Sequence, residues 1–392
     1  MIVQPKVRGF ICTTAHPEGC RAIVKEQIDY VKAQPKTEGP KKVLVIGASM
    51  GYGLSSRIAA AYSCGAATLG VIFDRNGSEK RTGTAGWYNT AAFESFAKAD
   101  GLYARTVNGD AYSKEVKEEV ISIIKEDLGK VGMVVYSLAA PKRVLADGTV
   151  CGSVLKTTGE PYTNKTIDLK NRTISEVTIG PATEEEIENT VKVMGGEDWR
   201  DWIEALSAAD VLEKDTVTVA YSYIGPEITH PIYADGSIGR AKEHLYRTAQ
   251  EMNEELSGVR AYVSVNKALV TQSSAAIPVV PLYISILYKV MKEKGVHEGC
   301  IEQMYRLFHD KLYGIAVRTD TNGYIRLDDY EMQPDVQEEV LKVWDALSNE
   351  NLEANADLDG YWEDFYRLFG FHAKNVDYDA DVDAVVPIAH VE

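Results

Sequence analysis

The chain carries a tyrosine and a lysine that together could perform acid catalysis. Tyr233 and Lys242 stand nine positions apart, on either side of Asp235-Gly236-Ser237. A tyrosine can donate a proton, and a nearby ammonium group lowers the tyrosine pKa from its usual value of about 10. On one helix, nine positions would place the two side chains on opposite faces. The pairing therefore requires Tyr233 to precede the helix, on a turn that Asp235 to Ser237 can form. The alternative is a packed tyrosine and a surface lysine.

A glycine-rich turn earlier in the chain could bind a dinucleotide. Four apolar residues, Val43 to Ile46, run into Gly47-x-x-x-Gly51-x-Gly53, and a helical pattern follows at once. The apolar run is typical of a strand covered on both faces, and such a glycine turn lets a diphosphate approach backbone N–H groups. The spacing differs from G-x-G-x-x-G and matches the variant of the short-chain dehydrogenases/reductases. Glycine turns also occur for packing reasons alone.

A carboxylate at the end of the next predicted strand bears on the choice of cofactor. Asp74 lies 23 positions after Gly51. A carboxylate there accepts hydrogen bonds from the adenosine ribose and repels a 2′-phosphate, which favours NADH over NADPH. The neighbouring Arg75 complicates this interpretation, because a basic residue could pair with that phosphate.

Further candidates follow the later strands, where an open parallel sheet forms its ligand crevice. Asp110-Ala111 and Leu138-Ala139 could contact adenosine, or could be structural. Tyr223 could donate to a substrate carbonyl, although an aromatic residue on a strand is more often core. Leu269-Val270-Thr271 could present backbone groups to the nicotinamide carboxamide.

The elements that must position these residues alternate between strand and helix. Strands are predicted at 43–46, 68–73, 103–107, 133–138, 216–223 and 261–265. Helices are predicted at 19–33, 53–62, 88–99, 113–128, 198–208, 237–256, 281–294, 299–313 and 335–347. Between 140 and 190 the alternation stops, and loops with short strands are expected. This pattern predicts an α/β fold, a doubly wound parallel Rossmann sheet with helices on both faces.

We predict one decorated domain without a linker. Its parts are an N-terminal extension (1–40), a first NAD-binding half (41–140), an insertion (141–200), a Tyr/Lys half (201–275), and substrate-covering helices with a C-terminal extension (276–392).

Composition excludes several classes of function. The formal net charge of −16 argues against nucleic-acid binding and against adhesion to anionic membranes. No apolar run approaches the roughly 20 residues of a membrane span, and the N-terminus lacks the apolar run that is expected of a signal peptide. Five scattered cysteines favour reduced thiols, so we expect a soluble cytoplasmic protein. His16-x3-Cys20 and His297-x2-Cys300 follow no familiar zinc spacing, and no metal is predicted.

Long sequence segments carry a family resemblance. They include RGFICTTAHPEGC, VLVIGASMGYGLSSRIAAA, GTAGWYN, NGDAYS, VVYSLAAP, VKVMGGEDW, AYSYIGPEIT, PLYISILYKVMKEKG and HEGCIEQMYRLF. With them, almost end to end, the chain resembles the long trans-2-enoyl-CoA and enoyl-acyl-carrier-protein reductases of bacteria. These form a branch of the short-chain superfamily that is marked by eight residues between tyrosine and lysine. The resemblance implies NADH-dependent reduction of the 2,3 double bond of an enoyl-CoA or enoyl-acyl-carrier-protein thioester.

The resemblance also implies roles for individual residues. Tyr233 would donate the proton or stabilise the enolate, Lys242 would bind cofactor and tune Tyr233, and Tyr223 would contact substrate. The implied cofactor-binding residues are Gly47, Ala48, Ser49, Met50, Gly51, Tyr52, Phe73, Asp74, Asp110, Ala111, Leu138, Ala139, Lys242, Leu269, Val270 and Thr271. The family usually has glutamate where this chain has Asp74, which keeps the charge but shortens its reach. A monomer is expected, because the decorations could cover assembly surfaces. The alternatives are a carbonyl-reducing short-chain dehydrogenase and a non-catalytic nucleotide sensor.

Overall fold

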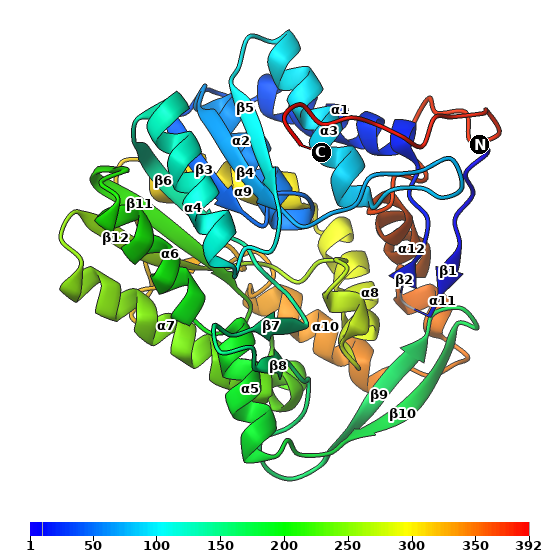
Figure 1. Cartoon of the computed structure of the whole chain (residues 1–392). Coiled ribbons are helices and arrows are strands. Elements are labelled where there is room, and N and C mark those ends of the chain that lie inside the picture. Colours follow the sequence, from blue (N-terminus) through cyan, green and yellow to red (C-terminus); the bar gives the residue numbers. More distant parts are fainter. Residues whose placement is uncertain (10, 392) are drawn as a thin grey trace.

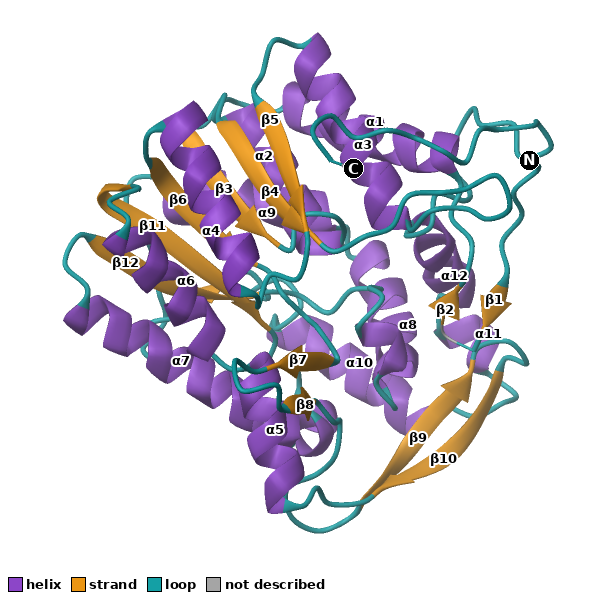
Figure 2. Cartoon of the chain, in the orientation of Figure 1, coloured by secondary structure: helices purple, strands orange, loops and turns teal. Residues whose placement is uncertain are grey.

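A seven-stranded parallel sheet forms the centre of the molecule (Figure 1; Figure 2). The computed structural model describes residues 1–9 and 11–391. The strands are β3 (Lys42–Ile46), β4 (Ala67–Ile72), β5 (Ala104–Asn108), β6 (Val131–Tyr136), β11 (Leu212–Ser222), β12 (Val259–Val265) and β13 (Ile325–Arg326). Their spatial order is β13-β12-β11-β6-β3-β4-β5, and all neighbours run parallel. The first strand of the sheet, β3, lies inside it. Strands β4 and β5 are added on one side of β3, and β6, β11, β12 and β13 are then added on the other side, which confirms the predicted doubly wound class.

Helices cover both faces of this sheet because its strands are apolar on both sides. Leu44 and Ile46 of β3 pack into one core cluster, and Val43 and Val45 into another. Figure 1 shows α4 (Lys114–Ile123), α6 (Glu197–Ala208) and α7 (Ser237–Glu255) on the near face. The other face is covered by α2 (Gly51–Ser63), α3 (Ala85–Ala99) and α9 (Cys300–Arg306), and α1 (Pro17–Ala33) packs outside α2 and α3. Such continuous apolar strands are typical of a buried parallel sheet.

All six predicted strands and all nine predicted helices occur, with ends shifted by a few residues. Two of the helices finish in π-helical turns, because α4 continues as Ile124–Leu128 and α9 as Leu307–Leu312. The remaining predicted helices correspond to α8 (Val280–Glu293) and α10 (Pro334–Ala346). Strong apolar periodicity therefore located the main elements correctly.

The prediction for residues 140–190 was wrong in one respect. The expected short strands occur as two antiparallel hairpins, β7 (Lys142–Val144) with β8 (Val150–Gly152) and β9 (Tyr162–Asp168) with β10 (Thr173–Ile179). The segment also holds a helix, α5 (Glu184–Met194), which the sequence analysis did not predict. Thr183 and Glu186 form a capping box at its start, a signal that was present in the sequence.

The C-terminal third closes the structure around α8. Strand β13 extends the sheet at its edge, and it was not predicted because it is only two residues long. Helices α10 and α12 (Leu358–Arg367) pack their apolar residues against α8, while the four-residue α11 (Leu352–Asn355) joins them. None of the helices within residues 1–9 and 11–391 is long and apolar enough to cross a membrane.

The last residues return to the first half of the chain. Tyr88 Oη donates to the Ala384 carbonyl at 2.7 Å, and Trp87 Nε1 donates to the Val386 carbonyl at 2.6 Å. The amino group of Met1 donates to the Val382 carbonyl at 2.7 Å, so the beginning of the chain lies against this tail as well. The short strands β1 (Val7–Arg8) and β2 (Ile11–Cys12) pair nearby (Figure 1).

Candidate active site

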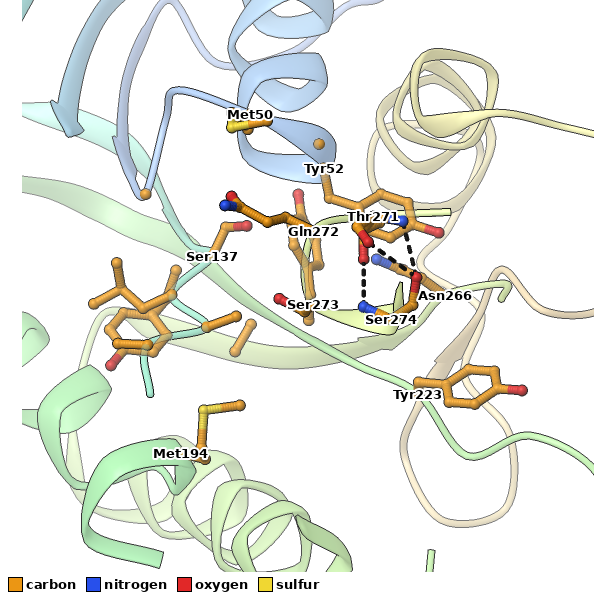
Figure 3. Close-up of a pocket in the computed structure, with 18 of the residues that line it drawn as sticks. Met50, Tyr52, Ser137, Met194, Tyr223, Asn266, Thr271, Gln272, Ser273 and Ser274 are labelled. Carbon is orange, nitrogen blue, oxygen red and sulfur yellow. Dashed lines mark hydrogen bonds between the residues drawn. The ribbon is translucent and has the colours of Figure 1, made fainter. Parts of the chain in front are cut away.

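A cavity of about 480 Å³ lies at the carboxyl ends of the strands, where doubly wound sheets bind ligands (Figure 3). The first residue after each of six strands lines it: Gly47, Phe73, Gly109, Ser137, Tyr223 and Asn266. All the predicted site residues line the same cavity except Ala48 and Val270. Those two lie behind its wall, where the Ala48 N–H bonds the Val71 carbonyl and the Val270 N–H bonds Tyr288 Oη.

The glycine turn forms one wall of the cavity, and its three glycines serve different purposes. A Cβ on Gly47, whose φ is +83°, would lie 2.2 Å from the Ser137 carbonyl oxygen. A Cβ on Gly53 would lie 1.8 Å from the Gly47 carbonyl oxygen. Gly51 has a φ of +53° but faces open space at the start of α2. Packing therefore explains Gly47 and Gly53, whereas Gly51 leaves the helix N-terminus open to an anionic ligand.

Asp74 is held at the start of α3. Thr84 Oγ1 donates to Asp74 Oδ1 at 2.7 Å, and the Asp74 N–H donates to Asn108 Oδ1 at 2.9 Å. A Cβ on Gly86 would come within 2.5 Å of both carboxylate oxygens, so only a glycine fits there. The carboxylate thus faces the positive end of a helix, and Arg75 beside it is exposed. This arrangement gives Asp74 a fixed position at the cavity edge.

Tyr233 lies before the helix that carries Lys242, as the spacing argument required. It caps a 3₁₀-helix (Glu227–Ile232), and α7 starts only at Ser237, with Gly236 as its N-cap. Lys242 Nζ donates to the Tyr221 carbonyl at 3.1 Å. Burial raises the pKa of Tyr233, with a smaller contribution from the nearby Tyr246, and burial lowers the pKa of Lys242 to about 8. In this arrangement the Lys242 ammonium group is hydrogen-bonded to a backbone carbonyl of β11.

Tyr223 stands beside Tyr233, and its hydroxyl is turned toward a buried carboxylate. The two rings meet edge to face, with centroids 5.1 Å apart. Tyr223 Oη donates to Glu331 Oε1 at 3.2 Å. Figure 3 shows the Tyr223 side chain extending away from Asn266 and Ser274. Tyr223, the tyrosine expected to bind substrate, is therefore hydrogen-bonded to Glu331, a residue from the C-terminal third of the chain.

The other predicted cofactor contacts lie on loops that are held by hydrogen bonds within the loop or to neighbouring elements. Asp110 Oδ1 accepts from the Tyr112 N–H at 3.0 Å, which forms a turn, and the Ala111 carbonyl accepts from Trp202 Nε1 at 3.1 Å. Leu138 and Ala139 follow Ser137, whose N–H bonds the Ile46 carbonyl at 2.8 Å. These bonds fix the loops, so the surfaces that they present to the cavity are preformed.

The loop after β12 bonds to itself at the positions expected to meet nicotinamide. Ser274 Oγ accepts from the Thr271 N–H at 2.8 Å and donates to the Leu269 carbonyl at 2.6 Å. The Ser274 N–H donates to Thr271 Oγ1 at 3.0 Å (Figure 3). These hydrogen bonds hold the loop in one conformation at the cavity.

Several lining residues were missed by the sequence analysis. Met194 reaches the cavity from α5, and Asn266, Lys267 and Ser274 reach it from the loop after β12. Lys267 Nζ donates to the Ala268 carbonyl at 2.9 Å, and burial lowers its pKa to about 8. The position of Asn266 and Lys267 directly after a strand was the one signal that could have identified them.

The paired His and Cys positions have structural environments. His16 Nδ1 accepts the Gly19 N–H at 3.0 Å and so caps α1, while His297 packs on the ring of Tyr288. Among residues 1–9 and 11–391, no three His, Cys, Asp or Glu side chains gather in a way that could hold a metal ion.

Comparison with protein families matches nearly the whole chain. Residues 2–79 match a model described as the NAD(P)H binding domain of trans-2-enoyl-CoA reductase, and residues 81–313 match the trans-2-enoyl-CoA reductase catalytic region. Residues 319–382 match a model described as an enoyl reductase FAD binding domain.

The geometry of residues 319–382 does not fit a flavin dinucleotide. Strand β13 is two residues long and leads into Leu327-Asp328 rather than into a glycine turn. The apolar faces of α10 and α12 are buried against α8. Of the described residues that line the cavity, Leu368 alone comes from this segment. A flavin needs a backbone approach for its diphosphate, which this segment does not offer.

Named relatives span the full length of the chain. The trans-2-enoyl-CoA reductase [NADH] of Ruminiclostridium cellulolyticum is 57% identical over 99% of both chains. The enoyl-[acyl-carrier-protein] reductase [NADH] of a Coxiella burnetii strain is 56% identical over 98% of this chain and 96% of its own. The crystal structure of Treponema denticola trans-2-enoyl-CoA reductase in complex with NAD superposes with a TM-score of 0.95 at 49% identity, covering 99% of this chain and 100% of that one. The Clostridium acetobutulicum trans-2-enoyl-CoA reductase in complex with NADH gives a TM-score of 0.95 at 45% identity, over 98% of each chain.

Proposed function

The chain belongs to the trans-2-enoyl-CoA reductase family, and we propose that it reduces the 2,3 double bond of trans-2-enoyl thioesters with NADH. One observation carries this proposal: the glycine turn, Asp74, Tyr233 and Lys242 all line one cavity at the carboxyl ends of the strands. The residues proposed to bind the dinucleotide therefore share a cavity with a potential proton donor, Tyr233. A non-catalytic nucleotide sensor would not need a proton donor.

The first half of the cavity holds the cofactor. The open N-terminus of α2 at Gly51 binds the diphosphate, because its N–H groups and helix dipole favour negative charge. Asp74 accepts from the adenosine ribose hydroxyls and disfavours a 2′-phosphate. NADH bound there supplies the hydride that the substrate receives at C3.

The residues of the second half of the cavity stabilise the negative charge that develops on the substrate. Once C3 has received the hydride, negative charge accumulates on the thioester oxygen and C2. Tyr233 donates a hydrogen bond or its proton to the enolate oxygen. C2 finally takes up the enol proton or a proton from solvent, and solvent restores any proton that Tyr233 has given up. Lys242 leaves the Tyr221 carbonyl to bind the nicotinamide ribose, and its positive charge then favours the tyrosinate form of Tyr233. The apolar residues of α8, including Val280 and Ile284, form a wall for the acyl chain.

We further propose that the enzyme works as a monomer in the cytoplasm. The five cysteines are free thiols, as expected in a reducing compartment. The β9–β10 hairpin and the C-terminal helices cover surface beside α8, where Lys165 of the hairpin donates to the Trp344 carbonyl at 2.6 Å. Size-exclusion chromatography with light scattering tests this, and a dimer mass at micromolar concentration would contradict it.

The test of the reaction compares two classes of substrate. NADH absorbance is followed with crotonyl-CoA, with a longer enoyl-CoA and an enoyl-acyl-carrier protein, and with a small ketone. We expect NADH consumption with enoyl thioesters and none above background with the ketone. Consumption with the ketone alone would instead identify a carbonyl reductase.

A further inference from the structure

A buried glutamate joins three segments that line the active site. Glu331 lies in the turn between β13 and α10 and is 0% exposed. Its Oε1 accepts from Tyr283 Oη at 2.7 Å and from Tyr223 Oη at 3.2 Å. Its Oε2 accepts from the Ala268 N–H at 2.7 Å. One carboxyl group thus connects the end of β11, the first turns of α8 and the loop after β12.

The hydrogen-bond capacity of Tyr223 limits what it can offer to a substrate. A tyrosine hydroxyl has one proton to donate, and an ionised carboxylate can only accept. While Glu331 is ionised, Tyr223 must donate to it and presents only lone pairs to the cavity. A thioester carbonyl or enolate oxygen also only accepts, so Tyr223 cannot then bond it.

Protonation of Glu331 reverses this arrangement. A carboxyl proton on Oε1 donates to Tyr223 Oη, while the other lone pair of Oε1 still accepts from Tyr283 and Oε2 still accepts from Ala268. The hydroxyl proton of Tyr223 is then free to turn toward the cavity. Tyr223 already stands beside Tyr233, so it can reach the same substrate oxygen.

We propose that Glu331 is a positioning residue that, with its carboxyl group protonated, directs the hydroxyl proton of Tyr223 to the thioester oxygen of the substrate. This rests on the proposed function, because it presumes that the oxygen binds beside Tyr233. Tyr223 and Tyr233 then form a two-donor site for the enolate, and a segment outside the sheet controls one of the donors.

The surroundings of Glu331 raise the pKa of its carboxyl group on balance. The titratable groups that face it are Tyr223, Tyr283, Lys267 and Asp328. Burial raises the pKa of Glu331 and Asp328 raises it further, while Lys267 and the hydrogen bond from Tyr283 act in the opposite direction. Asp328 is itself paired with Arg326 at 2.6 Å, and Lys267 bonds the Ala268 carbonyl.

Two substitutions at this position separate a proton-bearing role from a merely structural one. In E331Q the amide can turn so that its oxygen accepts from the Ala268 N–H and its NH₂ donates to Tyr223, as the protonated acid would, while Tyr283 loses its acceptor on this side chain. In E331A nothing orients Tyr223. We expect E331Q to keep kcat within about 3-fold of wild type and to extend activity to higher pH. We expect E331A to lower kcat about 10²-fold, the usual effect of losing one oxyanion donor.

A double-mutant cycle ties the effect to Tyr223. If Glu331 acts through that hydroxyl, E331A combined with Y223F lowers kcat no further than Y223F alone. Glu94→Gln is a matched control, because Glu94 is a buried carboxylate bonded to Thr106 and Arg57 away from the cavity lining. It should lower the Tm and leave the pH profile of kcat unchanged.

Failure of the role proposed for Glu331 and failure of the proposed function give different results. Multiplicative losses in the double mutant, or an E331Q enzyme as impaired as E331A at every pH, would overturn the role of Glu331. NADH affinity from fluorescence titration and the Tm verify that each variant is folded. If wild type consumes no NADH with any enoyl thioester, the proposed function itself fails, independently of Glu331.

Discussion

The two halves of the cavity are built in different ways. The cofactor half comes from one continuous stretch, since the glycine turn, Asp74 and Asp110 follow three successive strands within residues 42–110. The other half is assembled from Tyr223, Tyr233 and Lys242, with the loop after β12, helix α8 and Glu331 around them. The contacts proposed for the cofactor's diphosphate and for Asp74 are therefore a property of local sequence, whereas the proposed nicotinamide contacts and the proton-donating residues depend on long-range packing.

This difference predicts that substitutions in one half change kcat and substitutions in the other change cofactor affinity. The largest effect is expected for Tyr233→Phe, which removes the proposed proton donor and keeps the ring that packs on Tyr223. Stopped-flow absorbance should show kcat for crotonyl-CoA reduced by about 10³-fold. The Kd for NADH should change less than 2-fold, and unchanged kcat would remove Tyr233 from the mechanism.

A second substitution should separate activity from stability. Lys242→Met should lower kcat/KM about 10²-fold, because the charge near Tyr233 and the ribose contact are both lost. The pKa of Lys242 is lowered from 10.5 to about 8 in the folded protein, so below pH 8 its burial costs the native state up to about 3 kcal/mol. Removing it should raise the Tm of the cofactor-free enzyme at pH 7.

The pH dependence follows from the same shift. The unfolded chain keeps the Lys242 proton up to 10.5, so the destabilisation fades as pH rises from about 8 toward that value. The Tm advantage of Lys242→Met should shrink over this range. In wild type, kcat/KM should fall above about pH 8, as Lys242 loses its charge. A Tm difference that is constant with pH would contradict the assignment.

In the cofactor half, Asp74→Ala should alter selectivity without altering chemistry. Losing a charged acceptor at the ribose weakens NADH binding by roughly 1.5 kcal/mol, which is about 10-fold, and it relieves repulsion of a 2′-phosphate. The ratio of kcat/KM for NADH over NADPH should fall by at least that factor. Thr84→Val, which removes the bond to Asp74 and keeps the charge, should give a smaller change.

The smallest effect is expected at Gly51. With φ at +53° and open space around it, Gly51→Ala should cost about 1–2 kcal/mol in backbone strain and raise the KM for NADH several-fold. Gly53→Ala is the contrasting variant, because its Cβ would collide with the Gly47 carbonyl oxygen. Urea unfolding should show Gly53→Ala to be far less stable. Equal stability of the two variants would show that the turn can relax.

The strands and turns around the predicted cofactor half could be located from the sequence for a physical reason. Strands such as β3 and turns such as Gly47 to Gly53 are specified by neighbouring residues, so their positions can be inferred from pattern. The placement of Tyr233 before α7 also followed from helix geometry alone. These are consequences of local backbone preferences.

What sequence could not predict comes from contacts between distant segments. Glu331 is one acidic residue among 58, and nothing near it in sequence indicates that it is buried against Tyr223 and Tyr283. The contact of Lys242 with the Tyr221 carbonyl depends on how α7 packs on β12, the neighbour of β11. Strand β13 is too short to carry a pattern and exists because β12 offers it an edge.

The tail that bonds Trp87 and Tyr88 has a consequence for how the protein is made. Residues 384–386 are synthesised long after Tyr88 and Trp87, at sequence separations of 296 and 299, yet they support the helix that begins beside Asp74. The cofactor half, although local in sequence, therefore cannot reach its final form before these residues have been synthesised. A variant that lacks residues 384–386 should fold its sheet but bind NADH poorly.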